Sequence, residues 1–384
     1  MREIKPGVFY TGAIDWNRRN FDSVMQTPDG VTYNSYLVKG TTHTALLDTV
    51  EPRFVEGLLK ELEEVERLDY IVVHHTEQDH TGALPALLNK YPEAKIVCVA
   101  KAQTLAQYWF DLPPDRYMIV KDGDSIDLGG KTLTFYAMPW VHWADTMVSY
   151  LKEDRILFTC DLFGAHIAQA ELFAGEDERV VIAAKQYYGV IMAPYRNFIA
   201  KHIERIAVMD VDLIAPSHGP LHNQPAKVIA AYREWTSDAT KKLVLIPFVT
   251  MHDSTRLMVE ILVDELTGRG VEALQLDMAT PDVNRLAECF IDAAAIVWAS
   301  PVVMAGAHPN VLYAALFANY LKPKAKVMAV IGSMGWGSKM VEQLTGIIGD
   351  SKVEYLEPVI CKGIPREKDR EALAGMAENL KFRI

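Results

Sequence analysis

A short run of ligand-type side chains follows an apolar segment early in the chain. It reads Ile71-Val-Val-His-His-Thr-Glu-Gln-Asp-His80 and carries His75, Glu77, Asp79 and His80 within six residues. Where a chain stays extended, alternate side chains point the same way, so His75, Glu77 and Asp79 can converge. His80 lies at the entrance of a helix-like segment, Gly82–Asn89. The run indicates a metal site.

Three further candidates each follow a strand-like segment. His142 comes after LTFYAMP, Asp161 after ILFTC and His218 after LIAPS. Because α/β folds build their sites at the C-terminal ends of strands, we expect these side chains to join the first cluster. A single histidine at such a place is more often structural, and we assign five others to that class: His43, His74, His166, His202 and His222.

The seven candidates suit a pair of metal ions. Four imidazoles and three carboxylates offset most of the charge of two divalent cations, and one bridging carboxylate can hold the ions together. Zinc hydrolases of the metallo-β-lactamase type carry H-x-H-x-D-H here, whereas this chain has Glu77 in place of their second histidine. The oxygen-rich set favours iron or manganese, and a redox-active metal favours electron transfer over hydrolysis.

A second candidate site depends on the regular alternation of strands and helices after a seam near residues 224–242. This alternation indicates βαβ units and a doubly wound parallel sheet. We expect strands at Leu243–Val249, Val271–Leu276, Ala295–Ser300, Lys326–Ile331 and Val353–Val359. We expect helices at Arg256–Thr267, Asn284–Asp292, Pro309–Tyr320, Lys339–Ile348 and Arg366–Leu380. The chain thus divides into two domains, residues 1–240 and 241–384.

The first loop of this second half has the character of a phosphate site. It runs from a strand into a helix, where free backbone N–H groups and the helix dipole favour an anion. It contains neither GxGxxG nor a P-loop lysine, which favours a monoester phosphate such as that of FMN over a dinucleotide. Its residues are Thr250, Met251, His252, Asp253, Ser254 and Thr255.

Two later loops follow strands of the same predicted sheet, where a planar cofactor would lie at the switch point. In the last of them, two glycines allow close backbone approach to a flavin ring, and Trp336 can pack beside it. The candidates in the earlier loop are Ser300, Pro301, Val302, Val303, Ala305 and Gly306. Those in the later loop are Ser333, Met334, Gly335, Trp336 and Gly337.

Composition excludes several partners. The 384 residues carry a net charge of −11, which argues against nucleic acid or an anionic membrane surface as partner. The longest apolar stretch, Ala293–Ala307, is shorter than a bilayer span, and the N-terminus has no signal-peptide pattern. Four scattered cysteines without a CxxC pair predict a cytoplasmic location and exclude a rubredoxin-type iron centre within this chain.

At this point the sequence resembles a known family, the flavodiiron proteins, also called A-type flavoproteins. The resemblance covers essentially the whole chain and rests on the seven ligand-type residues and on GAIDWNRR, VTYNSYLV, HWADTMVSY and GSMGWGS. It implies two non-haem iron ions per chain, with Asp161 as the bridge. One iron would take His75, Glu77 and His142, and the other Asp79, His80 and His218. In some members the residue matching His80 lies off the metal.

The resemblance also implies architecture and activity. A metallo-β-lactamase-like αββα domain would precede a flavodoxin-like FMN domain in the short two-domain form, assembled as a head-to-tail homodimer or a dimer of dimers. The implied reaction reduces dioxygen to water or nitric oxide to nitrous oxide, with electrons relayed through FMN. The external donor would be a rubredoxin, a flavin reductase or a reduced deazaflavin coenzyme.

The chain departs from the family pattern at several places, and alternatives remain open. Phe21-Asp22-Ser23 stands where one branch carries a pocket histidine, so the resemblance does not choose between the two gases. Asp253 stands where the phosphate loop often has glycine, and Tyr187 and Tyr188 can line the pocket or belong to the core. The alternatives are a zinc hydrolase with an attached electron-carrier domain and a non-enzymatic electron carrier.

Overall fold

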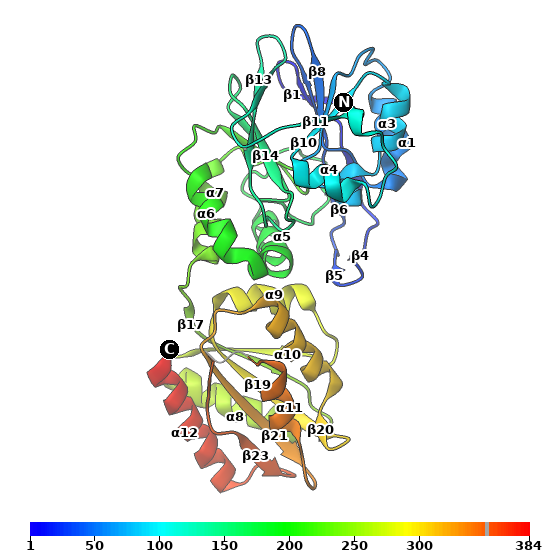
Figure 1. Ribbon diagram of the computed structural model, residues 1–384. Coiled ribbons are helices and arrows are strands. Elements are labelled where there is room, and N and C mark those ends of the chain that lie inside the picture. The colour runs from blue at the N-terminus through cyan, green and yellow to red at the C-terminus, as the bar shows by residue number, and fades with distance from the viewer. Residues whose placement is uncertain (350–352) are drawn as a thin grey trace. The chain divides into compact units, whose positions relative to one another are not determined.

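The chain forms two compact units, Met1–Thr236 and Ser237–Ile384 (Figure 1). The computed structural model describes residues 1–349 and 353–384. The division falls between residues 236 and 237, four residues before the expected boundary between 240 and 241.

The first unit begins with a seven-stranded sheet in which the last four strands run parallel. Ile71 packs on its outer side with α1 (Val55–Glu61), α3 (Leu84–Lys90) and α4 (Ala100–Ala106), whereas Val72 packs on its inner side. Both faces of the sheet are therefore buried. In spatial order the strands are β1 (Arg2–Lys5), β2 (Val8–Tyr10), β7 (Tyr36–Lys39), β8 (Thr44–Leu47), β9 (Tyr70–Val72), β10 (Lys95–Cys98) and β11 (Tyr117–Ile119).

A five-stranded sheet packs against the inner side of the first. Val72 and Val97 of the first sheet share one core with Phe135 and Phe158 of the second. Its strands in spatial order are β12 (Ser125–Asp127), β13 (Thr132–Ala137), β14 (Met147–Leu151), β15 (Ile156–Cys160) and β16 (Leu213–Pro216). The helices α5 (Glu178–Tyr187), α6 (Arg196–Ile206) and α7 (Pro225–Thr236) follow in this unit. The unit thus has the four layers of an αββα sandwich (Figure 1).

Two small antiparallel pairs lie outside these sheets. They are β3 (Ala13–Asp15) with β6 (Val31–Tyr33), and β4 (Asn20–Phe21) with β5 (Met25–Gln26).

The second unit is a doubly wound parallel sheet. In chain order its strands are β17 (Lys241–Phe248), β18 (Glu272–Asp277), β19 (Ala293–Val303), β21 (Val327–Met334) and the short pair β22 (Glu354–Tyr355) and β23 (Val359–Lys362). Their spatial order is β18-β17-β19-β21-β22, so the winding direction reverses between β17 and β19. This is the 2-1-3-4-5 order of flavodoxin-like folds, whose ligands bind at that switch point.

Helices cover both faces of this sheet (Figure 1). One face packs against α8 (Ser254–Gly268) and α12 (Glu367–Arg383). On the other lie α9 (Val283–Asp292), α10 (Pro309–Leu321) and α11 (Met340–Ile347). Among the described residues, no helix has the length and apolar character needed to cross a bilayer.

Two predicted elements of the second unit were wrong in detail. The expected strand Val353–Val359 is the two short strands β22 and β23, because Pro358 between them has no N–H to donate to a ladder. The expected loop after Ser300 is instead an extension of β19 that turns back into β20 (Gly306–Ala307). Met304 and Ala305 form the turn with φ of 49° and 63°, which is typical of a two-residue hairpin connection.

Candidate metal and flavin sites

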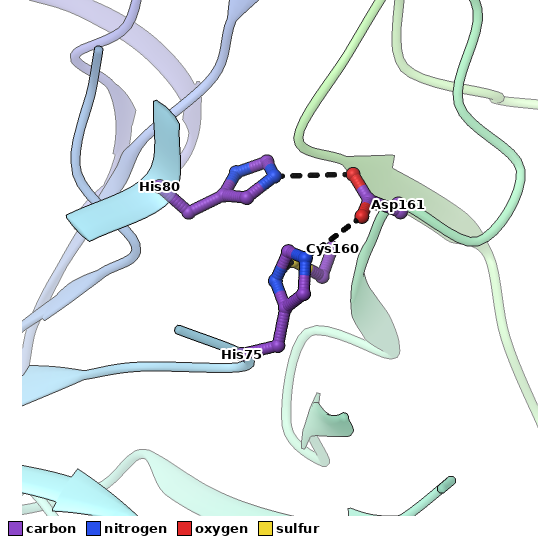
Figure 2. Close-up of side chains that lie close together, drawn as sticks. All are labelled: His75, His80, Cys160 and Asp161. Carbon is purple, nitrogen blue, oxygen red and sulfur yellow. Dashed lines mark hydrogen bonds and ion pairs between the residues drawn. The ribbon is translucent and has the colours of Figure 1, made fainter. Parts of the chain in front are cut away.

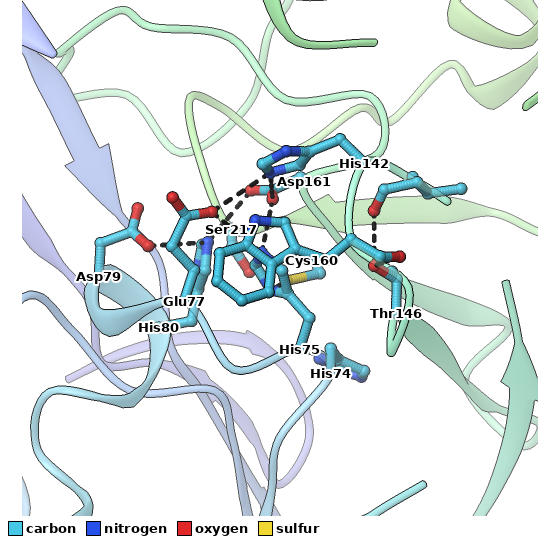
Figure 3. Close-up of polar contacts among 12 residues, drawn as sticks. His74, His75, Glu77, Asp79, His80, His142, Thr146, Cys160, Asp161 and Ser217 are labelled. Atoms are coloured by element: carbon cyan, nitrogen blue, oxygen red, sulfur yellow. Dashed lines mark hydrogen bonds and ion pairs between the residues drawn. The ribbon is translucent and has the colours of Figure 1, made fainter. Parts of the chain in front are cut away.

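All seven ligand-type residues belong to one cluster, which lies beyond the C-terminal ends of strands of both sheets. Figure 3 shows six of them, all but His218. His75 follows β9, His142 lies between β13 and β14, Asp161 directly follows β15, and His218 follows β16. Most of these side chains are fully buried, which excludes water as their main partner.

The side chains of the segment from His75 to His80 do not converge in the way that we expected for an extended chain. After His75 the backbone turns at Glu77 into a one-turn helix, α2 (Gln78–Thr81), which carries Asp79 and His80. Helical turning, rather than strand alternation, brings the later two side chains to the cluster. Asp145 supports the turn, because its carboxylate accepts hydrogen bonds from the backbone N–H and the hydroxyl of Thr76.

One group of donors converges on the Oδ2 side of Asp161. Nε2 of His75 lies 3.0 Å from Oδ2 of Asp161 and 3.3 Å from Oε2 of Glu77. Nε2 of His142 lies 3.0 Å and 3.2 Å from the same two oxygen atoms. The four side chains have the spacing of ligands around one ion.

A second group converges on the other carboxylate oxygen, Oδ1 of Asp161. Nε2 of His80 lies 3.1 Å from this oxygen and 3.3 Å from Oδ1 of Asp79. Nε2 of His218 lies 3.4 Å from Oδ1 of Asp161 and 3.1 Å from Oδ2 of Asp79. In Figure 2 one carboxylate oxygen of Asp161 is joined by a dashed line to His80 and the other to His75. A carboxylate with one oxygen in each group has the arrangement of a bridge between two ions.

Unsatisfied polar atoms test whether the cluster fits metal ions. Both oxygens of Asp79, Oδ1 of Asp161 and both ring nitrogens of His80 are buried without a hydrogen-bond partner in the described chain. Several of these atoms approach one another within 3.4 Å, but without the alignment of a hydrogen bond. Buried polar atoms are normally satisfied. Lone pairs that converge in this way fit cations at the centre of the cluster.

The charges of the cluster support the same reading. Burial by itself would lower the pKa of His80, but the carboxylates of Asp79 and Asp161 outweigh it and raise this pKa to about 9. Burial likewise opposes the charge on His142, while hydrogen bonds with Asp161 and Glu77 raise its pKa to about 9. The raised pKa of both rings reflects the negative charge that the carboxylates gather at the cluster, and this charge suits the binding of cations.

The outer nitrogens of two clustered histidines have identifiable partners. Nδ1 of His218 lies 2.7 Å from the carbonyl oxygen of Thr32, and Nδ1 of His75 lies 3.3 Å from Sγ of Cys160. An N–H donated on this side fixes the tautomer in which Nε2 is free to bind metal. Thr32 and Cys160 were not predicted from sequence, because neither is close in sequence to the histidine that it contacts.

Behind the cluster is a buried network around Asp48, which was also missed. Asp48 accepts hydrogen bonds from the backbone N–H of His74 and from the hydroxyl of Ser217, and lies 2.8 Å from Nδ1 of His74. Nε2 of His74 in turn contacts the hydroxyl of Ser149 at 2.7 Å. His74 is thus satisfied as a structural histidine, as expected. The sequence signal for Asp48 is its place directly after β8, the position that also marks Asp161 after β15.

One of the histidines expected to be structural lies against the cluster. The ring centroid of His166 is 5.4 Å from that of His218, 4.4 Å from that of Phe21 and 4.8 Å from that of Tyr187. Tyr187 thus belongs to the surroundings of the site. Tyr188 instead packs with Tyr232 and Trp235 in the core. The other expected structural histidines bond elsewhere: His43 to Thr42, His202 to Pro139 and His222 to Phe163.

In the second unit, the three segments predicted as flavin loops lie at the C-terminal ends of the neighbouring strands β17, β19 and β21, and the second segment is the β19–β20 hairpin. The hydroxyls of Thr255 at the start of α8 and Ser333 in β21 lie 3.2 Å apart, which brings the first and third loops together. Ser300 is fully buried, and its hydroxyl donates to the carbonyl of Pro301 and accepts from the backbone N–H of His308. The hydroxyl of Ser300 therefore holds the two ends of the β19–β20 hairpin together.

The conformation of the first loop accommodates Asp253 where loops of the flavodoxin type often have glycine. Asp253 adopts φ +60°, a left-handed conformation that aspartate accepts more readily than most residues. Its side chain is 82% exposed, and Oδ1 lies 3.4 Å from Nε of Arg256. The carboxylate thus points to solvent and is paired, which leaves the N-terminus of α8 open to an anion.

The third loop has room for a planar ring. A side-chain carbon added at Gly335 or Gly337 would meet no atom within 4 Å. Trp336 between them is 82% exposed and has a free face. The switch point, the hydroxyls and this open loop fit a flavin mononucleotide.

Comparison with known proteins adds an independent finding. The sequence profile described as ODP family beta lactamase matches residues 31–219. A nitric oxide reductase of Moorella thermoacetica is 33% identical and aligns over 99% of this chain and 98% of its own length. The structure of rubredoxin oxygen:oxidoreductase from Desulfovibrio gigas superposes with a TM-score of 0.92 at 30% identity, covering 99% of this chain and 98% of that one. The flavodiiron protein of Giardia intestinalis gives a TM-score of 0.93 at 27% identity, covering 100% and 96%.

Proposed function

This chain belongs to the flavodiiron protein family, and from that premise we propose that it reduces dioxygen to water or nitric oxide to nitrous oxide. The predicted metallo-β-lactamase-like and flavodoxin-like architecture is confirmed, and the chain is an oxidoreductase. The observation that carries the proposal is the division of the Asp161 carboxylate, which presents one oxygen to each group of donors.

We assign the seven clustered side chains as ligands of two non-haem iron ions. His75, Glu77 and His142 would hold one ion, and Asp79, His80 and His218 the other, with Asp161 shared. When bound, the iron pair supplies a binding place and electrons for the diatomic gas, and FMN supplies electrons to the iron. The oxygen-rich donor set, with Glu77 in place of a histidine, supports iron over zinc.

The side chains around the ligands limit access of water and hold the ligands in place. The rings of Phe21, His166 and Tyr187 pack around His218 and close that side of the cluster. On the opposite side, Trp143 packs edge-on against His75 with ring centroids 5.5 Å apart. Thr146 donates its hydroxyl proton to the carbonyl of Val141 and so fixes the loop that carries His142. A preorganised and largely dry site favours transfer of electrons to the bound gas over side reactions.

We assign the FMN phosphate to the N-terminus of α8, between Thr250 and Thr255. The isoalloxazine ring would lie over the loops after β19 and β21, near Trp336. Support comes from the switch point between β17 and β19 and from the contact of Thr255 with Ser333.

The proposal also covers the external electron donor, the assembly of the chain and its location in the cell. The name of the Desulfovibrio gigas relative supports a rubredoxin-type external donor. We further propose a head-to-tail homodimer in which the FMN of one chain serves the iron site of the other, through one interface used twice. The four cysteines are buried and form no disulfide in the described part of the chain, in keeping with a reducing cytoplasm.

The test is metal and flavin analysis followed by anaerobic turnover. Protein produced with iron supplied should contain about one FMN and two irons per chain. After reduction, it should consume dioxygen or nitric oxide with reduced rubredoxin, a flavin reductase or reduced deazaflavin as donor. Zinc in place of iron together with no bound flavin would favour the hydrolase alternative. Bound FMN without metal would favour the electron carrier.

A further inference from the structure

Cys160, the residue directly before the shared carboxylate of Asp161, has an unusual backbone. Its φ is +51°, in the left-handed region, and its side chain is 1% exposed. The register between β15 and β16 shifts at this residue. A residue with a side chain pays about 1 kcal/mol or more of conformational free energy for this backbone conformation, whereas glycine adopts it freely. The position therefore favours glycine on backbone grounds alone, yet a cysteine occupies it.

The thiol makes one contact that a glycine could not make. Sγ of Cys160 lies 3.3 Å from Nδ1 of His75. The other ring nitrogen of His75, Nε2, faces Asp161 and Glu77. The two nitrogens of an imidazole point to different sides of the ring, so the thiol contacts His75 on a different side from the carboxylates that face Nε2.

Direct metal ligation by the thiol is the competing reading, because Sγ also lies within reach of His80 and Asp161. Cysteine binds metal as the thiolate. Sγ contacts Nδ1 of His75, whereas the carboxylates of Asp161 and Glu77 face the other ring nitrogen, Nε2. The cluster also contains a full set of seven other donors.

We propose that Cys160 is a positioning residue that accepts a hydrogen bond from Nδ1–H of His75 and thereby sets both the orientation and the donor strength of this ligand. The inference rests on the proposed metal site. A ligand histidine usually donates its outer N–H to a carboxylate, a carbonyl or water, which raises its basicity. His218 follows this rule through the carbonyl of Thr32 at 2.7 Å. A thiol is a weaker hydrogen-bond acceptor than a carbonyl. His75 therefore gains less basicity than His218 and donates its Nε2 electron pair less strongly to a metal.

The consequence concerns the metal position that His75 would serve. A less basic imidazole stabilises the oxidised metal less, so the weak acceptor behind His75 raises the reduction potential of the ion that His75 binds. Replacement of the thiol by a stronger acceptor should lower this potential, and its removal should raise it. The two changes thus have opposite signs.

Three variants separate the side chain from the backbone. Cys160→Ser supplies a stronger acceptor, Cys160→Ala removes the acceptor and keeps the strained φ, and Cys160→Gly removes both. An anaerobic redox titration of the iron signals measures the reduction potential of each variant. We expect a lower potential for the serine variant than for wild type. We expect a higher potential for the alanine and glycine variants, which should be raised by similar amounts. Cys98→Ser, at another buried thiol of the same unit, should leave it unchanged. An alanine variant equal to wild type beside a shifted glycine variant would assign the effect to the backbone and overturn the proposal.

A second readout is independent of redox activity and of the native metal. In zinc-loaded protein with ¹⁵N-labelled histidine, the Nδ1 proton resonance of His75 should shift in Cys160→Ser and Cys160→Ala but not in Cys98→Ser. This result would support the hydrogen bond even if the native metal proved to be zinc and the oxidoreductase function failed. An unchanged resonance in folded, metal-loaded variants would overturn the inference while the proposed function stands.

Discussion

Asp161 and His142 are in direct contact, with Oδ2 of the carboxylate 3.0 Å from Nε2 of the ring. The other oxygen of Asp161, Oδ1, is 3.1 Å from Nε2 of His80. His142 and His80 belong to different donor groups, and Asp161 contacts both groups, each through one of its oxygens.

Replacement of Asp161 by alanine should therefore be more damaging than replacement of a single histidine. The variant loses the bridge and one of the three carboxylates that balance two cations. We expect iron content well below half of wild type and activity reduced about a hundredfold or more. His142→Ala is the matched comparison, because it removes one ligand from one group only. Full iron loading and normal turnover of Asp161→Ala would show that the bridge is misassigned.

Glu77→His tests why the site prefers iron. The substitution restores the H-x-H-x-D-H pattern of zinc hydrolases and exchanges a carboxylate for an imidazole. With fewer charges and more nitrogen donors, the zinc-to-iron ratio of protein grown with both metals should rise several-fold. Glu77→Asp keeps the charge and serves as control. If elemental analysis finds the same ratio in all three proteins, Glu77 does not determine metal choice.

The clustering of these seven side chains could be predicted from sequence, because residue type and a place close to a strand end suffice to find them. Contacts such as Cys160 with His75 could not, because they join residues 85 positions apart through a shift in strand register. The path of the first run was also hidden. Nothing in the pattern distinguished an extended chain from the one-turn helix α2 that carries Asp79 and His80.

In the second unit, the order of elements was predictable from apolar periodicity, whereas the β19–β20 hairpin was not. Its two turn residues, Met304 and Ala305, have positive φ without the glycine, asparagine or aspartate that usually marks such a turn. The sequence therefore read as an apolar strand that ended in a loop.

Asp253→Asn should bind FMN more tightly than wild type. The substitution removes a negative charge next to the proposed phosphate site, and asparagine tolerates the φ of +60°. Because the carboxylate is exposed and paired with Arg256, the gain should be modest, about twofold to fivefold in Kd. Fluorescence titration of the flavin-free protein measures it, and the gain should shrink at high salt. Glu260→Gln, further along α8, is the control. A weaker Kd for Asp253→Asn would mean that the carboxylate assists binding.

The dimer proposal predicts complementation between two inactive variants. His142→Ala lacks a metal ligand, and a disrupted loop at Gly332–Ser338 lacks a flavin contact. If FMN serves the partner's iron, a hybrid dimer should regain roughly one working site of two, while each parent stays inactive. Subunit exchange followed by turnover measures this. No recovery after verified exchange, together with activity of a dilute monomer, would contradict transfer between chains.

The most direct test of the two-iron assignment is anomalous diffraction at the iron absorption edge, on crystals of protein produced with iron supplied. Two iron peaks are expected, one among His75, Glu77 and His142 and one among Asp79, His80 and His218, with the carboxylate of Asp161 between them. A single peak, or peaks that appear only at the zinc edge, would contradict the account.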